Sequence, residues 1–180
     1  MTPRVIGVDL SLAATGVSNG KWCRTIATKG TNADTIVQTD RRLRQIADDV
    51  AKDTLSVDLV VIEGPSHNSR YGHAWDRAGL WWRIVHRLLA ADVPVAVVPP
   101  MIRALYATGK AGAKKEAVLL AAIRRWPACP ISNNNEADAL VLAAMGLDWL
   151  GCPLAVMPAT HRAALAKVAW PDNLTGDTTP

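Results

Sequence analysis

The feature that most constrains this sequence is an aspartate placed directly after an apolar segment near the N-terminus. The segment Val5–Val17 predicts a buried strand that ends at Asp9, a turn of small residues and the start of a second strand. A carboxylate in that position is costly to desolvate unless a metal, another cation or backbone N–H groups compensate its charge. Asp9 is therefore a candidate site residue, although an aspartate can also simply begin a tight turn.

A second apolar strand is predicted over residues 57–63, and it also ends in an acid, Glu63. It follows residues 40–53, whose apolar side chains recur with the spacing of an amphipathic helix. A continuous apolar run after a helix is typical of a strand that is buried on both faces in a parallel arrangement. If the two acid-ended strands are neighbours, Asp9 and Glu63 lie close together, and their like charges raise a pKa unless a cation bridges them.

The remaining segments complete the pattern of an α/β chain. The Asn19-Gly20 pair predicts a hairpin turn, so the first three strands form an antiparallel meander. A helix over residues 75–91 and a strand over 94–98 follow. The apolar residues between 158 and 170 predict a further short helix there.

Length and composition indicate one globular domain. The chain has 180 residues, of which 49% are hydrophobic and 20% charged, and it contains no internal repeat. We predict a single domain over residues 1–170 and a flexible tail over residues 171–180. No apolar run approaches the length of a membrane span, so we expect a cytoplasmic protein.

Positive charge gathers in residues 101–126, where six basic residues accompany one acid, although the whole chain carries a net charge of only +4. Here the sequence predicts a glycine-containing basic loop with Lys110 and Lys114, and a helix that opens near Lys115. A helix start offers backbone N–H groups and lysines to a phosphate. A solvated basic helix is the alternative.

Aromatic residues suggest two further surfaces. Arg70 and Tyr71 lie in a predicted loop and could stack on nucleic-acid bases, or could belong to an ordinary polar loop. Trp81 and Trp82 are adjacent on a predicted helix, where neighbours point about 100° apart, so both cannot face one core. One of them could face a partner subunit, and a wide apolar face is the alternative.

A third acid occurs in the helix predicted after the asparagine run Asn133–Asn135. Asp138 lies between two alanines, which let another group come close, and it shares a helical face with Asn135. Glu136 points about 200° away from Asp138 on the same helix. Taken alone, Asp138 could merely favour the N-terminal end of the helix.

Together these motifs resemble the RuvC-type Holliday-junction resolvases, which are nucleases of the ribonuclease H-like superfamily. The similarity rests on the segments Gly7–Ser11 with Thr15–Gly16, Val61–Glu63, Thr108–Gly109 with Ala113–Val118, and Glu136–Leu140. It covers roughly residues 4–148. The resemblance implies an α/β fold in which a ribonuclease H-like, mixed five-stranded sheet is flanked by helices.

The resemblance also implies a function. It suggests a structure-specific DNA endonuclease that resolves Holliday junctions or related branched DNA by metal-dependent phosphodiester hydrolysis, in recombination or repair. The implied catalytic residues are Asp9, Glu63, Asp138 and Lys115. The implied ligands for Mg²⁺ or Mn²⁺, two per active site, are Asp9, Glu63, Asp138 and Asn135.

Partners follow from the same resemblance. Branched DNA, as a four-way junction or a flap, is the implied substrate, and the implied DNA contacts are Arg70, Tyr71, Lys110, Lys114 and Lys115. Resolvases of this kind act as homodimers because a two-fold junction needs two paired cuts. The helix with Trp81 and Trp82 is the candidate interface.

Two positions depart from the pattern of this family. Asn135 stands where the family has an acid or a histidine; its amide oxygen can ligate a hard cation but brings no charge, so Glu136 is an alternative ligand if the helix begins late. Lys114 replaces an acid that is common in the basic loop.

Two alternative functions therefore stay open. One is a non-catalytic protein that binds branched DNA, an interpretation favoured by Asn135. The other is an actin/hexokinase-like ATP-binding domain, whose first phosphate loop is similar to Gly7-Val8-Asp9 with Thr15-Gly16.

Overall fold

Five strands form one mixed sheet in the computed structural model of the chain, which describes residues 2–65 and 73–172. The strands are β1 Val5–Asp9, β2 Ala14–Ser18, β3 Cys23–Ala27, β4 Leu59–Glu63 and β5 Val95–Val98. Their order in the sheet is β3-β2-β1-β4-β5. The first three form the predicted antiparallel meander, with Gly20 at φ 87° in the second turn, and β1, β4 and β5 run parallel.

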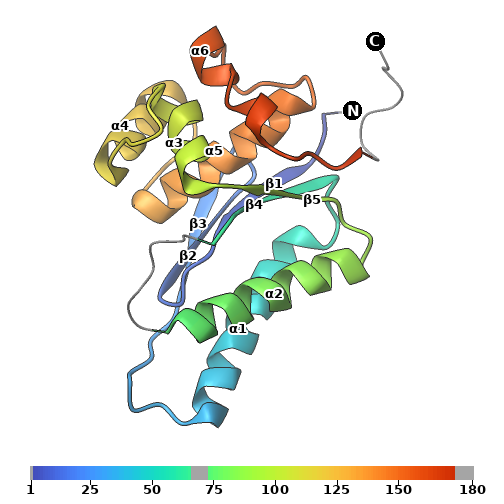
Figure 1. Cartoon of the computed structure of the whole chain (residues 1–180), viewed down its shortest axis with the longest axis vertical. Coiled ribbons are helices and arrows are strands. Elements are labelled where there is room, and N and C mark those ends of the chain that lie inside the picture. The colour runs from blue at the N-terminus through green and yellow to red at the C-terminus, as the bar shows by residue number, and fades with distance from the viewer. Residues whose placement is uncertain (1, 66–72, 173–180) are drawn as a thin grey trace.

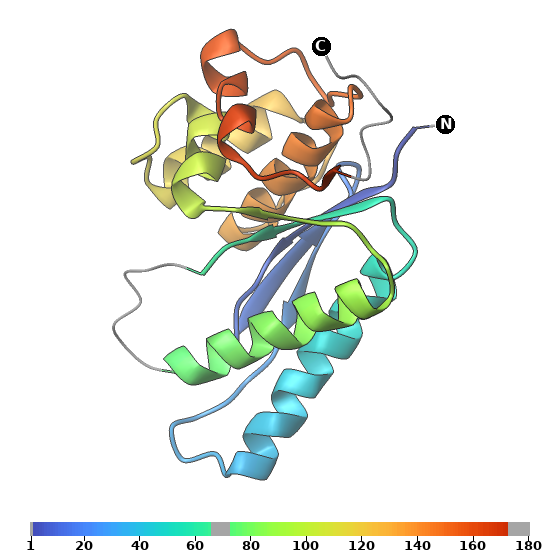
Figure 2. The same cartoon turned by 45° about the vertical axis from the view of Figure 1, so that its right-hand side comes forward.

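Helices cover both faces of this sheet (Figures 1 and 2). They are α1 Ile36–Thr54, α2 Ala74–Ala90, α3 Pro100–Thr108, α4 Lys115–Arg125, α5 Asn134–Trp149 and α6 Ala159–Arg162, followed by a 3₁₀ turn, Leu165–Lys167. The first two pack on one face and α3, α4 and α5 on the other, so the sheet separates two apolar cores. Within the described ranges, no helix is both long and apolar enough to cross a membrane.

Most predicted elements are present with modest changes at their ends. The helix α1 begins four residues before the predicted start because Thr35 and Gln38 form a capping box ahead of its apolar stripe. The helix predicted within residues 158–170 is divided into α6 and the 3₁₀ turn. The predicted tail lies outside the described residues from 173 onward.

Helix α3 is the element that the sequence analysis did not predict. Pro99 and Pro100 follow the end of β5 and also start a helix: Pro99 is extended at the N-cap and Pro100 is the first helical residue. Proline is favoured at that position because the first turn leaves its backbone nitrogen without a helical acceptor in any case. The helix ends at Gly109, whose φ of 77° suits a glycine C-cap.

The buried helix α5 lies directly against the sheet because glycines remove the side chains between them. A Cβ atom on Gly7 would lie 2.1 Å from the backbone oxygen of Ala139, and one on Gly16 would lie 2.0 Å from that of Asn135. Farther along, Gly146 leaves room for Val5 and Val61. This contact brings the N-terminal half of α5 to the end of β1.

A substitution at Gly7 tests this close contact. Gly7→Ala should destabilise the fold by about 3 kcal/mol or more, because the backbone of α5 cannot yield as a flexible side chain would. Thermal or urea unfolding followed by circular dichroism would measure the loss.

Gly79→Ala is the matched control, because an added Cβ there meets nothing within 4 Å and Gly79 lies in the middle of α2. It should stabilise the protein by roughly 0.5–1 kcal/mol through helix propensity. Equal stability of the Gly7→Ala variant and the wild type would contradict the account of how α5 is placed.

Candidate functional site

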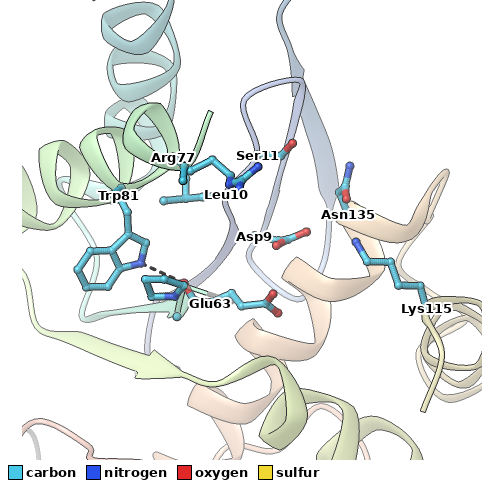
Figure 3. A pocket seen from close by; sticks show the side chains of 12 residues that line it. Asp9, Leu10, Ser11, Glu63, Arg77, Trp81, Lys115 and Asn135 are labelled. Carbon is cyan, nitrogen blue, oxygen red and sulfur yellow. Dashed lines mark hydrogen bonds between the residues drawn. The ribbon is translucent and has the colours of Figure 1, made fainter. Parts of the chain in front are cut away.

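Two of the predicted acids lie at the ends of neighbouring parallel strands. Val8 pairs with Ile62 in the register of β1 and β4, so Asp9 and Glu63 are the next residues on adjacent strands. Asp9 is only 7% exposed. Figure 3 shows both carboxylates facing the same space. The sequence-based expectation that these acids come together is met.

Asp138 reaches the same region from helix α5, which packs on one face of the sheet. It lies near the start of α5 and is 1% exposed. Its neighbour Ala139 is the residue whose backbone touches Gly7, so the glycine contact also sets the position of Asp138. Two strand ends and one helix thus supply three acidic side chains to a single region.

Arg103 from α3 is the main residue of this region that the sequence analysis missed. Its side chain is 6% exposed; Nε donates a hydrogen bond to Glu63 Oε2, and Nη1 donates one to Asp138 Oδ1. The sequence showed Arg103 only as part of a basic segment, because α3 itself was not expected. A buried arginine between two of the three acids changes the charge balance of the site.

Burial and mutual repulsion raise the pKa values of Asp9 and Asp138. The pKa of Asp9 lies well above its ordinary value, chiefly because of desolvation and then because of the charges of Glu63 and Asp138. Desolvation raises the pKa of Asp138 to about 6, although the charge of Arg103 opposes that shift. Arg103 therefore offsets only part of the cost of gathering these carboxylates.

The donor chemistry fits a hard divalent cation. Carboxylate oxygens are the ligands that Mg²⁺ and Mn²⁺ prefer. Asp138 Oδ2 is buried and has no hydrogen-bond partner within the described part of the chain, so one oxygen there is available to a ligand. As the side chains stand, residues 2–65 and 73–172 hold no converged group of three or more acidic, histidine or cysteine ligands. Binding would thus require the carboxylates to turn toward the ion.

A pocket of about 370 Å³ opens beside Asp9 and Glu63. Its lining includes Lys115, the first residue of α4, and Asn135, on the first turn of α5. Figure 3 shows both side chains across the pocket from Glu63, with Asp9 between. The structure therefore places Asn135 and Lys115 with Asp9 and Glu63, as the family resemblance implies, whereas Asp138 does not line this pocket.

Glu136, the alternative ligand, has a different place. Its carboxylate accepts hydrogen bonds from the Thr25 hydroxyl and the Ser132 backbone N–H, each at 2.7 Å. These contacts tie the start of α5 to β3, and Glu136 does not line the pocket. Of the two candidates, Asn135 is the one beside Asp9.

The other predicted DNA contacts are less closely tied to the pocket. Lys110 and Lys114 are exposed on the loop between α3 and α4, and neither lines the pocket. Arg70 and Tyr71 lie outside the described residues.

Helix α2 contributes Trp81 to the pocket, which the sequence analysis did not expect. The Trp81 indole N–H donates a 3.1 Å hydrogen bond to the backbone oxygen of Glu63. Trp82, which contacts the Trp81 ring edge to face, is 63% exposed. The two adjacent rings thus have different surroundings, as the 100° helical step requires, and a pocket role for one was not readable from spacing alone.

Comparison with solved protein structures shows which fold the chain has. No protein-family model matches the chain, and no curated protein matches it. Among solved structures, RuvC from Thermus thermophilus aligns with a TM-score of 0.61 and 17% identity over 84% of this chain and 99% of that one. The chain has the ribonuclease H-like fold.

Two further structures share this ribonuclease H-like fold. T. thermophilus RuvC in complex with a Holliday junction substrate aligns with a TM-score of 0.57 and 20% identity, over 78% of this chain and 90% of that one. The yeast mitochondrial Holliday junction resolvase Ydc2 aligns with a TM-score of 0.53 and 10% identity, over 92% of this chain and 81% of that one. At such identities the likeness concerns architecture, and the site must be argued from its own residues.

The raised pKa of Asp138 predicts a pH-dependent stability. The pKa of Asp138 is about 6 in the folded protein against an ordinary value of 3.8, so the folded protein binds this proton more tightly than the unfolded chain does. Protonated Asp138 therefore contributes to the free energy of unfolding at low pH, and that contribution is lost as the pH rises through about 6. Without metal, the free energy of unfolding should fall between about pH 4 and about pH 7, by up to about 3 kcal/mol from Asp138. Asp138→Asn should flatten the profile.

Added Mg²⁺ supplies the internal control for this prediction, because it binds the ionised carboxylates. Mg²⁺ should raise the melting temperature more at about pH 8 than at about pH 5. The raised pKa of Asp138 would be contradicted if the Asp138→Asn variant kept the wild-type dependence of stability on pH. It would also be contradicted if Mg²⁺ raised the melting temperature equally at the two pH values.

Proposed function

We propose that this protein is a divalent-metal-dependent endonuclease that cuts branched DNA, with the four-way Holliday junction as its first candidate substrate. One observation carries the proposal: carboxylates from β1, β4 and α5, of which Asp9 and Asp138 are buried and Glu63 partly buried, gather beside a pocket that also receives Lys115. The ribonuclease H-like fold supports this interpretation, and no other gathering of buried acids in the described residues offers comparable chemistry.

Asp9, Glu63 and Asp138 would hold the cation, Mg²⁺ or Mn²⁺, with Asn135 as a neutral oxygen donor at the edge. When bound, the cation activates a water nucleophile and stabilises charge on the phosphate and the leaving oxygen. The protein's own contribution is to hold the three carboxylates together beside the pocket, where burial and mutual repulsion favour binding of a cation. Hydrolysis would leave 3′-hydroxyl and 5′-phosphate ends, as the family resemblance implies.

Lys115 and the start of α4 would bind the substrate phosphate. The N-cap of α4, Lys114, makes no side-chain capping bond, so the first backbone N–H groups of the helix remain available to an anion. Lys115 projects into the pocket from this turn, and Lys110 and Lys114 add positive charge outside it. Such binding depends on phosphate contacts and should weaken steeply with salt.

A homodimer would supply the paired cuts that a two-fold junction requires. The helix α2 supports this part of the proposal because Trp75, Trp82 and Leu89 are 90%, 63% and 57% exposed on it. Trp81 would link that face to the site through its bond to Glu63. A cytoplasmic location remains part of the same proposal.

A non-catalytic DNA-binding protein is the second candidate, and one observation favours it. Arg103 already pairs with Glu63 and Asp138, so two of the three acids have a cationic partner without any metal. In that case, the pocket would bind the DNA backbone through Lys115 and would not hydrolyse it.

Cleavage of labelled DNA separates the two candidates. Purified protein with Mg²⁺ or Mn²⁺ should nick a four-way junction in symmetric pairs, faster than linear duplex or a 5′ flap. Asp9→Asn should lower the single-turnover rate by about 10²-fold or more, because it removes a charged ligand, and Lys115→Ala by a similar factor through lost charge stabilisation.

Lys167→Ala is the matched control, because that exposed lysine lies on the 3₁₀ turn away from the pocket. Its rate should equal that of the wild type. Tight junction binding without cutting, unchanged in Asp9→Asn, would reject the enzyme and favour the binding protein.

A further inference from the structure

Arg103 is a permanent positive charge built into the group of acids. Its guanidinium stays protonated at any ordinary pH, and its side chain is 6% exposed. Tyr106 and Ala107, on the next turn of α3, are also buried, so the helix that carries the arginine is held firmly in the core. This cation cannot leave the site by a simple rotation into solvent.

We propose that Arg103 takes the place of one of the two metal ions implied by the family resemblance, so that the site binds a single divalent cation. This inference rests on the proposed function and specifies how many metal ions that function uses.

The hydrogen bonds of Arg103 leave room for one ion. Each bond engages one carboxylate oxygen, Glu63 Oε2 or Asp138 Oδ1. The second oxygen of Asp138 is buried without a partner in the described residues, and Glu63 and Asp9 both line the open pocket. One oxygen from each acid can therefore turn to a shared ion while Arg103 keeps its bonds.

The charge balance leads to the same number. Ionised Asp9, Glu63 and Asp138 carry three negative charges, and Arg103 neutralises one of them. A single divalent cation cancels the remaining two, so the site becomes neutral. A second divalent cation would leave an excess of positive charge among the acids, beside the further positive charge of Lys115, which also lines the pocket.

Equilibrium titration with Mn²⁺, read by electron paramagnetic resonance of the free ion, counts the ions bound per chain. The wild type should bind one Mn²⁺ tightly, and Arg103→Gln should bind two, because loss of the guanidinium frees Glu63 Oε2 and Asp138 Oδ1 for a second ion and makes the charge of a two-ion site less positive. Arg87→Gln is the matched control: Arg87 pairs with Asp48 at the surface, so the variant loses an arginine–aspartate pair and should still bind one. Two ions in the wild type, or one in Arg103→Gln, would overturn the proposal.

Arg103→Lys covers the case in which Arg103→Gln fails to fold. It keeps the positive charge, so it should bind one Mn²⁺, with circular dichroism verifying its fold. Two ions bound to Arg103→Lys would contradict the charge argument.

Cleavage measured beside the titration separates this inference from the proposed function. One tightly bound Mn²⁺ with no cutting of any DNA would reject the nuclease and leave the ion count standing. Junction cutting with two bound ions would support the nuclease and reject the role given to Arg103. A wild type that binds no Mn²⁺ would reject both.

Discussion

The close contact between α5 and the sheet is the constraint on which the site depends. Gly7 and Gly16 have no side chains, so the backbone of α5 rests almost directly on β1 and β2. That contact fixes Asp138 over the end of β1, where Asp9 already lies. Without it, the third acid would stand at least a side chain's thickness farther away, and the three carboxylates would not gather in one region.

Desolvation and mutual repulsion of these acids are unfavourable, and the protein compensates them only in part. Asp9 and Asp138 are both buried, and desolvation is the largest cause of the raised pKa of each. Arg103 lowers the cost through its bonds to Glu63 and Asp138, but the pKa of Asp138 still lies near 6. In the proposed function, the unmet part of the charge would make the site receptive to a cation or to the positive end of a ligand.

Local sequence patterns were sufficient to predict the strands, their acidic ends and the helix that carries Asp138, whereas the place of Asp138 beside the other two acids was implied by the family resemblance. An apolar run that ends in a carboxylate is unusual, and parallel strands bring their carboxyl ends to one edge of a sheet. Arg103 could not be predicted in the same way, because its role depends on contacts 35 and 40 residues away in the chain. Its helix was also concealed by two prolines that served both as the end of β5 and as the start of α3. Which of Asn135 and Glu136 faces the pocket depended on where α5 begins, and the Asn133 cap decides it.

In the proposed function, Asp9, Glu63 and Asp138 together hold a divalent cation. The most direct measurement is the anomalous difference map of a crystal soaked with Mn²⁺, collected near the manganese absorption edge. The account predicts a peak bonded to oxygen atoms of all three carboxylates, with Arg103 still paired to Glu63 and Asp138. A map with no peak among these residues, from crystals at saturating Mn²⁺, would contradict it.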